Sequence, residues 1–133
     1  MAGETNLQVL LKSMQPVLDP KRWVFVSLPW EQASSSLEDA AGWVREQEGV
    51  TLILAQQTAD RAGLSYQKLF QRITLQVHSS LAAVGLLAEI TRALADAGIA
   101  SNVISGYYHD HVYVPAGKGA EALGILQKLS RRF

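Results

Sequence analysis

The sequence has no cysteine, no excess of charge of either sign and no long apolar run. Without cysteine, disulfides, zinc–thiolate sites and thiol nucleophiles are excluded, and the composition suits a reducing cytoplasm. The 12 basic and 12 acidic residues cancel, which leaves no electrostatic footprint for nucleic acid or an anionic membrane. The apolar run VTLILA is far shorter than the ~20 residues of a membrane span, and the N-terminus lacks a signal-peptide pattern. We therefore expect a soluble, cytoplasmic protein with no nucleic-acid or membrane partner.

The remaining composition is that of an ordinary globular protein. Of the 133 residues, 48% are hydrophobic and 18% are charged, so the chain fits one domain or two very small ones fused. The sequence contains no G-x-S-x-G elbow, no phosphate-binding loop and no dinucleotide fingerprint. These absences argue against nucleophilic catalysis and against a nucleotide cofactor.

Short elements follow one another in the first half of the chain, which is rich in strands and poor in helices. A helix should begin after Thr5 or Asn6, either of which can cap it, and should end before Pro16. Residues 32–36 are polar and serine-rich, which predicts a loop. The other elements expected here are a strand over residues 23–28, a hairpin of 43–46 with 49–54, and a short helix over 55–62 that ends at Gly63.

Clearer periodicity in the second half predicts the order strand, helix, strand, strand, helix. The corresponding residues are 72–77, 84–97, 99–105, 111–114 and 119–129. Ser79 and Ser80 precede the first of these helices and can cap it. This is the ferredoxin-like order without its last strand. We expect a segment of the first half to fill the open sheet edge, or the edge to pair with another copy of the chain.

Two histidines, His109 and His111, lie two residues apart beside Tyr107 and Tyr108. They can be read as metal ligands, with His78 as the third, or as residues of a β-hairpin turn. No HExxH pattern or dense carboxylate group accompanies them, so the hairpin is favoured and no metal is expected. Gly106 supports the hairpin because glycine tolerates a positive φ at a chain reversal.

The stretch LQVHSSLAAVGLLAEITRALADAGIASNVISGYYHDHVYV, residues 75–114, resembles the ACT-domain family. It has a strand, a loop ending near Gly85, a helix ending in LADAGI and then the segment SNVIS. The hairpin Glu48-Gly49 and the apolar strand after it strengthen the resemblance. The pattern is closest to small bacterial double-ACT proteins of unassigned function, and it is similar to the ACT domains of aspartokinases and of cytosolic arginine sensors.

The resemblance implies an α+β, ferredoxin-like (βαββαβ) ACT-type sandwich with two ACT-like halves in tandem. Residues 1–65 would form a degenerate N-terminal half, and residues 66–133 would form the C-terminal ACT domain. The implied function is that of a regulatory sensor that binds a small molecule, most simply an amino acid. Such a module has no catalytic activity and no cofactor. ACT domains usually pair side by side, which implies a homodimer or a higher homo-oligomer.

In that family the ligand lies between the loop after the first strand of one domain and the second strand of its partner. The matching positions here are Ser79, Ser80, Leu81, Val84 and Gly85 on the loop, and Asn102, Val103 and Ile104 on the strand. Aspartokinase-type domains often have asparagine directly after the G-I pair, where this chain has Ala100. Asn102 lies two positions further on, so it faces the same side of a strand.

Physical chemistry allows more than one role for these residues. A helix that begins after the serines would offer amide hydrogens and a positive dipole end to a carboxylate, or the serines would only cap it. At the level of function, one alternative is a structural or partner-binding ACT-like protein that uses its sheet edge to oligomerise and binds no ligand. Another is a metal-dependent enzyme that uses His78, His109 and His111.

Overall fold

The chain crosses twice between two units in the computed structural model, which describes residues 2–133. The larger unit contains the residues up to Pro20 together with Gln71–Phe133, and the smaller unit is Lys21–Phe70. Strand β1 (Pro16–Leu28) starts in the larger unit and ends in the smaller one. Strand β4 (Phe70–Leu75) brings the chain back into the larger unit.

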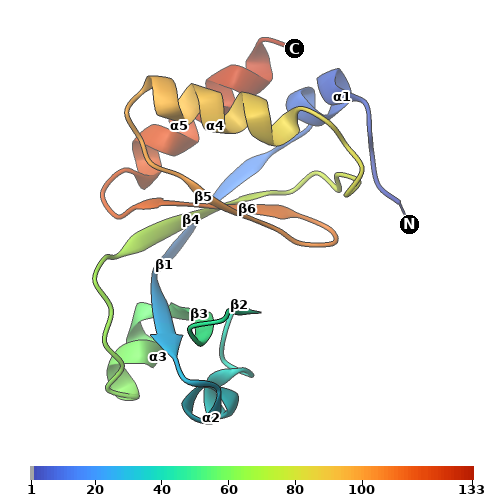
Figure 1. Cartoon of the computed structure of the whole chain (residues 1–133). Helices are drawn as coiled ribbons and strands as arrows, with labels where there is room; N and C mark the ends of the chain where they lie inside the picture. The colour runs from blue at the N-terminus through green and yellow to red at the C-terminus, as the bar shows by residue number, and fades with distance from the viewer. Residues whose placement is uncertain (1) are drawn as a thin grey trace. The chain divides into compact units, whose positions relative to one another are not determined.

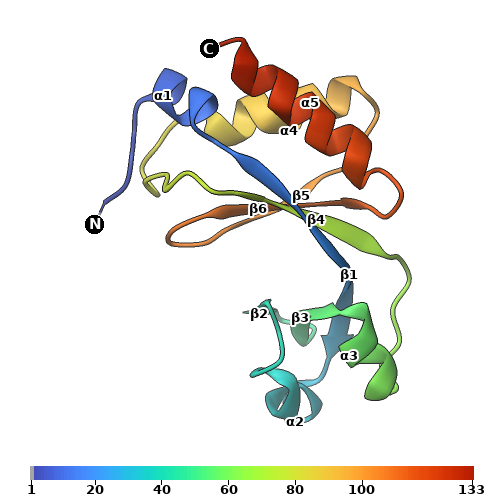
Figure 2. The same ribbon diagram turned by 180° about the vertical axis from the view of Figure 1, so that it is seen from behind.

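The larger unit is a sheet with helices on one face. Its strand order is β1-β4-β6-β5, where β5 is Asn102–Ser105 and β6 is Asp110–Pro115. Helices α1 (Leu7–Lys12), α4 (Leu86–Asp96) and α5 (Gly119–Arg131) lie on the same side of this sheet (Figures 1 and 2). The predicted order strand, helix, strand, strand, helix is confirmed, and so is the ferredoxin-like class.

The start of β1 fills the position of the missing fourth strand. It lies beside β4, as the first of the two alternatives for the open edge predicted. The Asp19 carboxylate accepts a hydrogen bond from the Arg72 guanidinium at 2.6 Å, and both side chains are about one-fifth exposed. Just before β1, the backbone carbonyl of Met14 accepts from the Gln76 amide at 2.9 Å. The N-terminal segment is therefore a structural part of the larger unit.

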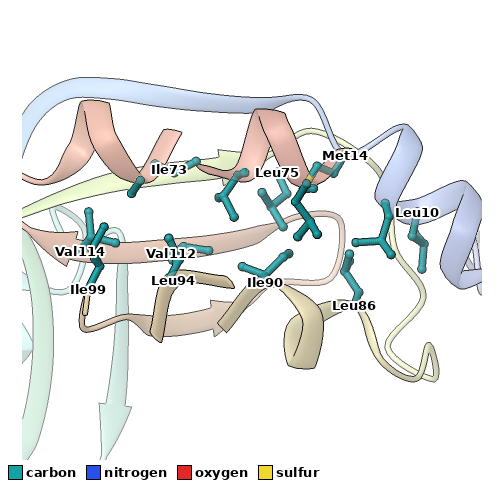
Figure 3. Close-up of a cluster of buried hydrophobic side chains, with 14 residues drawn as sticks. Leu10, Met14, Ile73, Leu75, Leu86, Ile90, Leu94, Ile99, Val112 and Val114 are labelled. Atoms are coloured by element: carbon teal, nitrogen blue, oxygen red, sulfur yellow. The ribbon is translucent and has the colours of Figure 1, made fainter. Parts of the chain in front are cut away.

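The core of the larger unit lies between its helices and its sheet. Alternate residues of the strands, such as Ile73 with Leu75 and Val112 with Val114, point to the helices. Helix α4 contributes Leu86, Ile90 and Leu94, which are spaced four residues apart and are all buried. Figure 3 shows these side chains converging with those of the N-terminal segment. Leu10, Leu11 and Met14 are fully buried in the same cluster.

Local interactions fix the ends of two helices. The Asn6 side chain accepts a hydrogen bond from the Val9 amide at 3.1 Å, so Asn6 is the cap of α1, one of the two residues predicted. Helix α5 begins at Gly119 as expected. The side-chain carbonyl of Gln71 accepts from the amides of Gly117 and Gly119 at 3.0 and 2.9 Å. A Cβ at residue 119 would lie 2.6 Å from that side chain, so a larger residue would displace the Gln71 amide and disturb these hydrogen bonds.

The smaller unit has the strand order β2-β3-β1, where β2 is Gly42–Arg45 and β3 is Val50–Ala55. The predicted hairpin of 43–46 with 49–54 and the short helix, α3 (Gln56–Arg61), are confirmed. The predicted loop over residues 32–36 is wrong, because α2 (Trp30–Ala33) and the 3-10 turn η1 (Ser34–Ser36) occupy it. The hydroxyls of Ser34 and Ser35 donate to backbone carbonyls three residues earlier at 3.3 Å, which makes serine compatible with this helical turn.

Over the described residues 2–133, no helix has both the length and the apolar character needed to cross a membrane.

The packing of α1 gives a test of the N-terminal segment. Leu10→Ala removes a fully buried side chain, so we expect it to lower the free energy of unfolding by about 2–5 kcal/mol. Val9→Ala is the matched control, because Val9 lies in the same helix and is 43% exposed. This control should change stability by less than ~0.5 kcal/mol. Urea unfolding followed by circular dichroism measures both, and equal effects would show that α1 does not belong to the core.

Candidate functional site

Residues 76–85 connect β4 to α4, and their second part, residues 79–85, is the loop that contains the predicted binding residues. The Ser79 hydroxyl is buried and donates to the Asp110 carboxylate at 3.0 Å. The Ser80 hydroxyl accepts from the Ala82 amide at 3.1 Å. Neither serine reaches the first turn of α4, so the prediction that they cap this helix is wrong. The reason is that the helix begins only at Leu86.

Gly85 is the residue from which α4 starts. Its φ is 105°, a left-handed value that disfavours a side chain, and a Cβ there would lie 3.1 Å from the Leu7 Cδ2 atom. No side chain among the described residues caps α4. The amides of its first turn have no intrahelical partners by the geometry of a helix start, and they carry the positive end of the helix dipole.

A cavity of about 150 Å³ lies at this helix start. It is smaller than the ~300–1,000 Å³ typical of sites for drug-sized molecules, so it suits a small ligand. The walls come from the loop, the first turn of α4 and the end of the β5–β6 hairpin. The lining residues are Ser79, Ser80, Leu81, Ala83, Gly85, Leu86, Leu87, Ala88, Ser105 and Asp110.

Four of the predicted loop residues, Ser79, Ser80, Leu81 and Gly85, line this cavity. Val84 does not line it and is 83% exposed. The three predicted strand residues Asn102, Val103 and Ile104 lie on β5, which is the last strand of the sheet. They do not line the cavity of their own chain. They are therefore placed at an open sheet edge.

Asp110 is the functional candidate that sequence reasoning missed. It is 5% exposed and pairs with Ser105 across the hairpin, which brings its carboxylate to the cavity wall. A signal was available, because Asp110, Val112 and Val114 alternate and face the same side of β6. A carboxylate on the core face of a strand is costly unless it has a partner. Ser79 is such a partner, and the cavity beside the carboxylate makes Asp110 a candidate binding residue.

The cavity thus has two poles of opposite sign. One is the Asp110 carboxylate, which is held by Ser79. The other is the first turn of α4, whose amides attract an anion. A molecule with both an ammonium and a carboxylate group is complementary to this arrangement.

The histidines belong to the hairpin and to the sheet. The Gly106 amide donates to the His109 carbonyl at 2.9 Å, which closes the β5–β6 turn and confirms the predicted hairpin. Gly106 does not have a positive φ, so that part of the prediction is wrong. Glycine is favoured instead by a close approach of the backbone, because a Cβ would lie 3.0 Å from the His109 carbonyl oxygen.

The three imidazoles have different surroundings. His111 Nδ1 lies 2.9 Å from the Thr74 hydroxyl. The ring centroid of His78 lies 4.9 Å from that of Tyr108. Among residues 2–133, no group of three or more His, Cys, Asp or Glu side chains is arranged to hold a metal ion.

Burial lowers the pKa of His111 from its ordinary 6.5, and the charges of Arg72 and His109 lower it further. The unfolded chain therefore binds a proton at His111 at a higher pH than the folded chain does. This difference in proton binding contributes to the free energy of unfolding at neutral pH. The contribution is lost as the pH falls from about 6.5 through the pKa of His111 in the folded chain.

We expect His111→Asn, which keeps a polar atom near Thr74, to flatten the loss of stability between about pH 7 and pH 5. Thermal unfolding at a series of pH values measures this, with the NMR titration of the His111 ring as a direct check. A variant whose stability falls with pH as steeply as that of the parent protein would contradict the assignment.

Comparison with known proteins covers nearly the whole chain. Models of the family described as ACT domain match residues 2–71 and residues 71–128. A crystal structure of a Vibrio cholerae protein of unknown function, described as a possible transport protein, is 42% identical in sequence. The match covers 93% of this chain and 95% of that one, with a TM-score of 0.82. No curated protein matches the chain.

More distant structures share the fold. The ligand-free regulatory subunit of aspartate kinase from Thermus thermophilus has a TM-score of 0.67 at 10% identity, covering 88% of this chain and 97% of that chain. A protein from Agrobacterium tumefaciens has a TM-score of 0.66 at 16% identity, covering 83% and 84%.

Proposed function

Since the chain belongs to the ACT-domain family and carries two ACT domains in tandem, we propose that it is a regulatory module that binds a small amino acid. The protein senses the ligand and does no chemistry on it. The observation that carries this proposal is the cavity at the start of α4, with a buried carboxylate on one wall and uncapped helix amides on another.

Each group of an amino acid has a counterpart in this cavity. The ligand carboxylate binds the amides of Leu86 and Leu87, where the helix dipole stabilises a negative charge. The ligand ammonium binds the Asp110 carboxylate, because a charge-assisted hydrogen bond is stronger than a neutral one. Ser79 holds Asp110 in place. Leu81, which is 68% exposed at the cavity rim, contacts the ligand side chain.

A second copy of the chain completes the site in this proposal. The strand β5 ends the sheet and offers its unpaired edge to a partner. Joined sheets would bring Asn102, Val103 and Ile104 of one copy toward the loop of the other, with Val84 on the exposed side of that loop. Size measurement by light scattering should show a homodimer or a larger oligomer, and a monomer at all concentrations would remove this part of the proposal.

The structural neighbours support a regulatory role. Two of the proteins with this fold, from Thermus thermophilus and Thermus flavus, are described as regulatory subunits of aspartate kinase. The Vibrio cholerae relative is described as a possible transport protein, and binding a small zwitterion is compatible with both descriptions.

We place the boundary between the two ACT-like halves of the sequence at residues 65 and 66.

The exposed edge of β5 also favours a second function, in which the protein is a structural or partner-binding module without a ligand. Its oligomer would then be independent of amino acids. Light scattering with and without each of the twenty amino acids distinguishes the two functions.

A thermal-shift screen of the twenty amino acids tests the main proposal. A ligand at 100 times its dissociation constant adds about 2.7 kcal/mol to the free energy of unfolding. Asp110→Asn keeps the shape of the side chain and removes the charge that binds the ammonium, so we expect the affinity to fall about ten- to a hundredfold.

Asp96→Asn is the matched control, because Asp96 is exposed at the far end of α4. It should bind the ligand as the parent protein does. Unfolding of each variant without ligand shows whether the fold is kept. Equal affinity in Asp110→Asn and the parent protein would overturn the assignment of the ammonium site.

A further inference from the structure

The smaller unit contains a cavity of about 460 Å³, which is larger than the one at the start of α4. Its size falls within the ~300–1,000 Å³ range of small-molecule sites. It lies between β1 and the segment that leads to β4. The lining residues are Phe25, Ser27, Ser65, Tyr66, Gln67, Lys68 and Phe70.

One face of β1 accounts for the position of this cavity. Val24 and Val26 point into the core of the smaller unit. Phe25 and Ser27 alternate with them and therefore face the opposite side of the sheet. Residues 64–69, which lead into β4, form an irregular segment instead of a strand beside this part of β1. The space between that segment and β1 remains open.

Aromatic rings form one wall of the cavity. Phe25 and Phe70 are half-buried, and their ring centroids lie 5.1 Å apart at an interplanar angle of 68°. Tyr66 is fixed by its hydroxyl, which donates to the Asp60 carboxylate at 2.7 Å and accepts from the Gln56 amide at 3.3 Å. These rings offer a preformed surface for a flat apolar group.

Polar side chains without protein partners form the rest of the lining. Within the described part of the chain, Ser27, Ser65, Gln67 and Lys68 make no hydrogen bond or ion pair through their side chains. Lys68 is the only charged residue of the lining. Its ammonium is a point charge, whereas phosphate groups are commonly bound by several cations or a bidentate arginine. The lining therefore suits a ligand with a single negative charge.

We propose that this cavity binds a small aromatic carboxylate. The ring of the ligand lies against Phe25 and Phe70, and its carboxylate accepts hydrogen bonds from the Lys68 ammonium. The site is built only from residues of the smaller unit, so it is separate from the cavity that contains Asp110. The protein then carries two ligand sites of different chemistry.

Benzoate is the probe for this site, and two related molecules separate its features. Benzamide has the ring without the charge, and acetate has the charge without the ring. Amide chemical shifts of the full chain, followed during titration, should show saturable binding of benzoate that maps to residues 64–70 and to β1. Benzamide should bind at least about tenfold more weakly, the scale of one charge-assisted hydrogen bond. Acetate should also bind at least about tenfold more weakly, because it lacks the ring that buries apolar surface.

Lys68→Gln should weaken benzoate binding about tenfold, and Lys68→Arg should preserve it. Lys128→Gln is the matched control, because Lys128 is an exposed lysine on α5 of the larger unit. Phe70→Leu keeps an apolar side chain but removes the ring, and it should also weaken binding. The amide spectrum of each variant shows whether its fold is kept.

Any of three results would overturn the proposal: no saturable shifts with benzoate, equal binding of benzoate and benzamide, or unchanged benzoate binding in Lys68→Gln. Asp110→Asn should leave benzoate binding unchanged. A loss of benzoate binding in that variant would place the probe at the start of α4 and would also overturn the proposal. A protein that binds benzoate here but no amino acid would refute the proposed function and leave this second site standing.

Discussion

The larger unit depends on the filling of one sheet edge. Residues 71–133 supply three strands and two helices, and β4 would be left with an open side without the start of β1. The ion pair of Asp19 with Arg72 joins residues 53 positions apart in the sequence. The burial of Leu10, Leu11 and Met14 adds apolar contacts to this pairing. An unpaired sheet edge invites association with other chains, so this filling also limits which edges remain available to partners.

The same N-terminal segment positions the candidate site. The Glu4 amide donates to the His78 carbonyl at 2.9 Å, and the Ser80 amide donates to the Glu4 carbonyl at 2.8 Å. Leu7 packs against Gly85, where α4 begins. The loop that lines the cavity is therefore held from outside by a segment more than 70 positions earlier in the sequence. A rigid loop keeps the amides of α4 pre-organised, which reduces the entropy that a ligand must overcome on binding.

Elements with strong periodicity could be predicted from the sequence, and their exact starts could not. The alternation of Ile73 and Leu75 and the spacing of Leu86, Ile90 and Leu94 report directly on a buried face. Ser79 and Ser80 are residue types that commonly cap helices. In the folded chain, however, the Ser79 hydroxyl donates a hydrogen bond to the Asp110 carboxylate, which lies far away in the sequence. The helix begins only after Gly85, whose backbone is left-handed.

The sequence alone does not separate Asp110 from its neighbours, because an acidic residue between two histidines is equally compatible with a metal site or a hairpin turn. Its role depends on the register that places it opposite Ser105 and on the core-facing side of β6. Periodicity read from Val112 and Val114 indicates that side, but only the three-dimensional structure brings in Ser79 and the helix start. Four loop residues that line the cavity could thus be named from the resemblance, whereas the buried carboxylate on its wall could not.

The two units have similar strand orders, β2-β3-β1 in the smaller and β5-β6-β4 in the larger. They differ in the helix that follows β1 in the smaller unit and β4 in the larger unit. In the larger unit this helix is α4, with 11 residues, and its aligned peptide dipoles give a positive end that an anion can bind. In the smaller unit the corresponding helix is α2, with four residues and Pro29 before it. A single turn has few aligned dipoles to sum, so it offers little attraction for a carboxylate. The start of α2 therefore attracts an anion less than the start of α4 does, and the anion site that we propose in the smaller unit relies on the side-chain ammonium of Lys68.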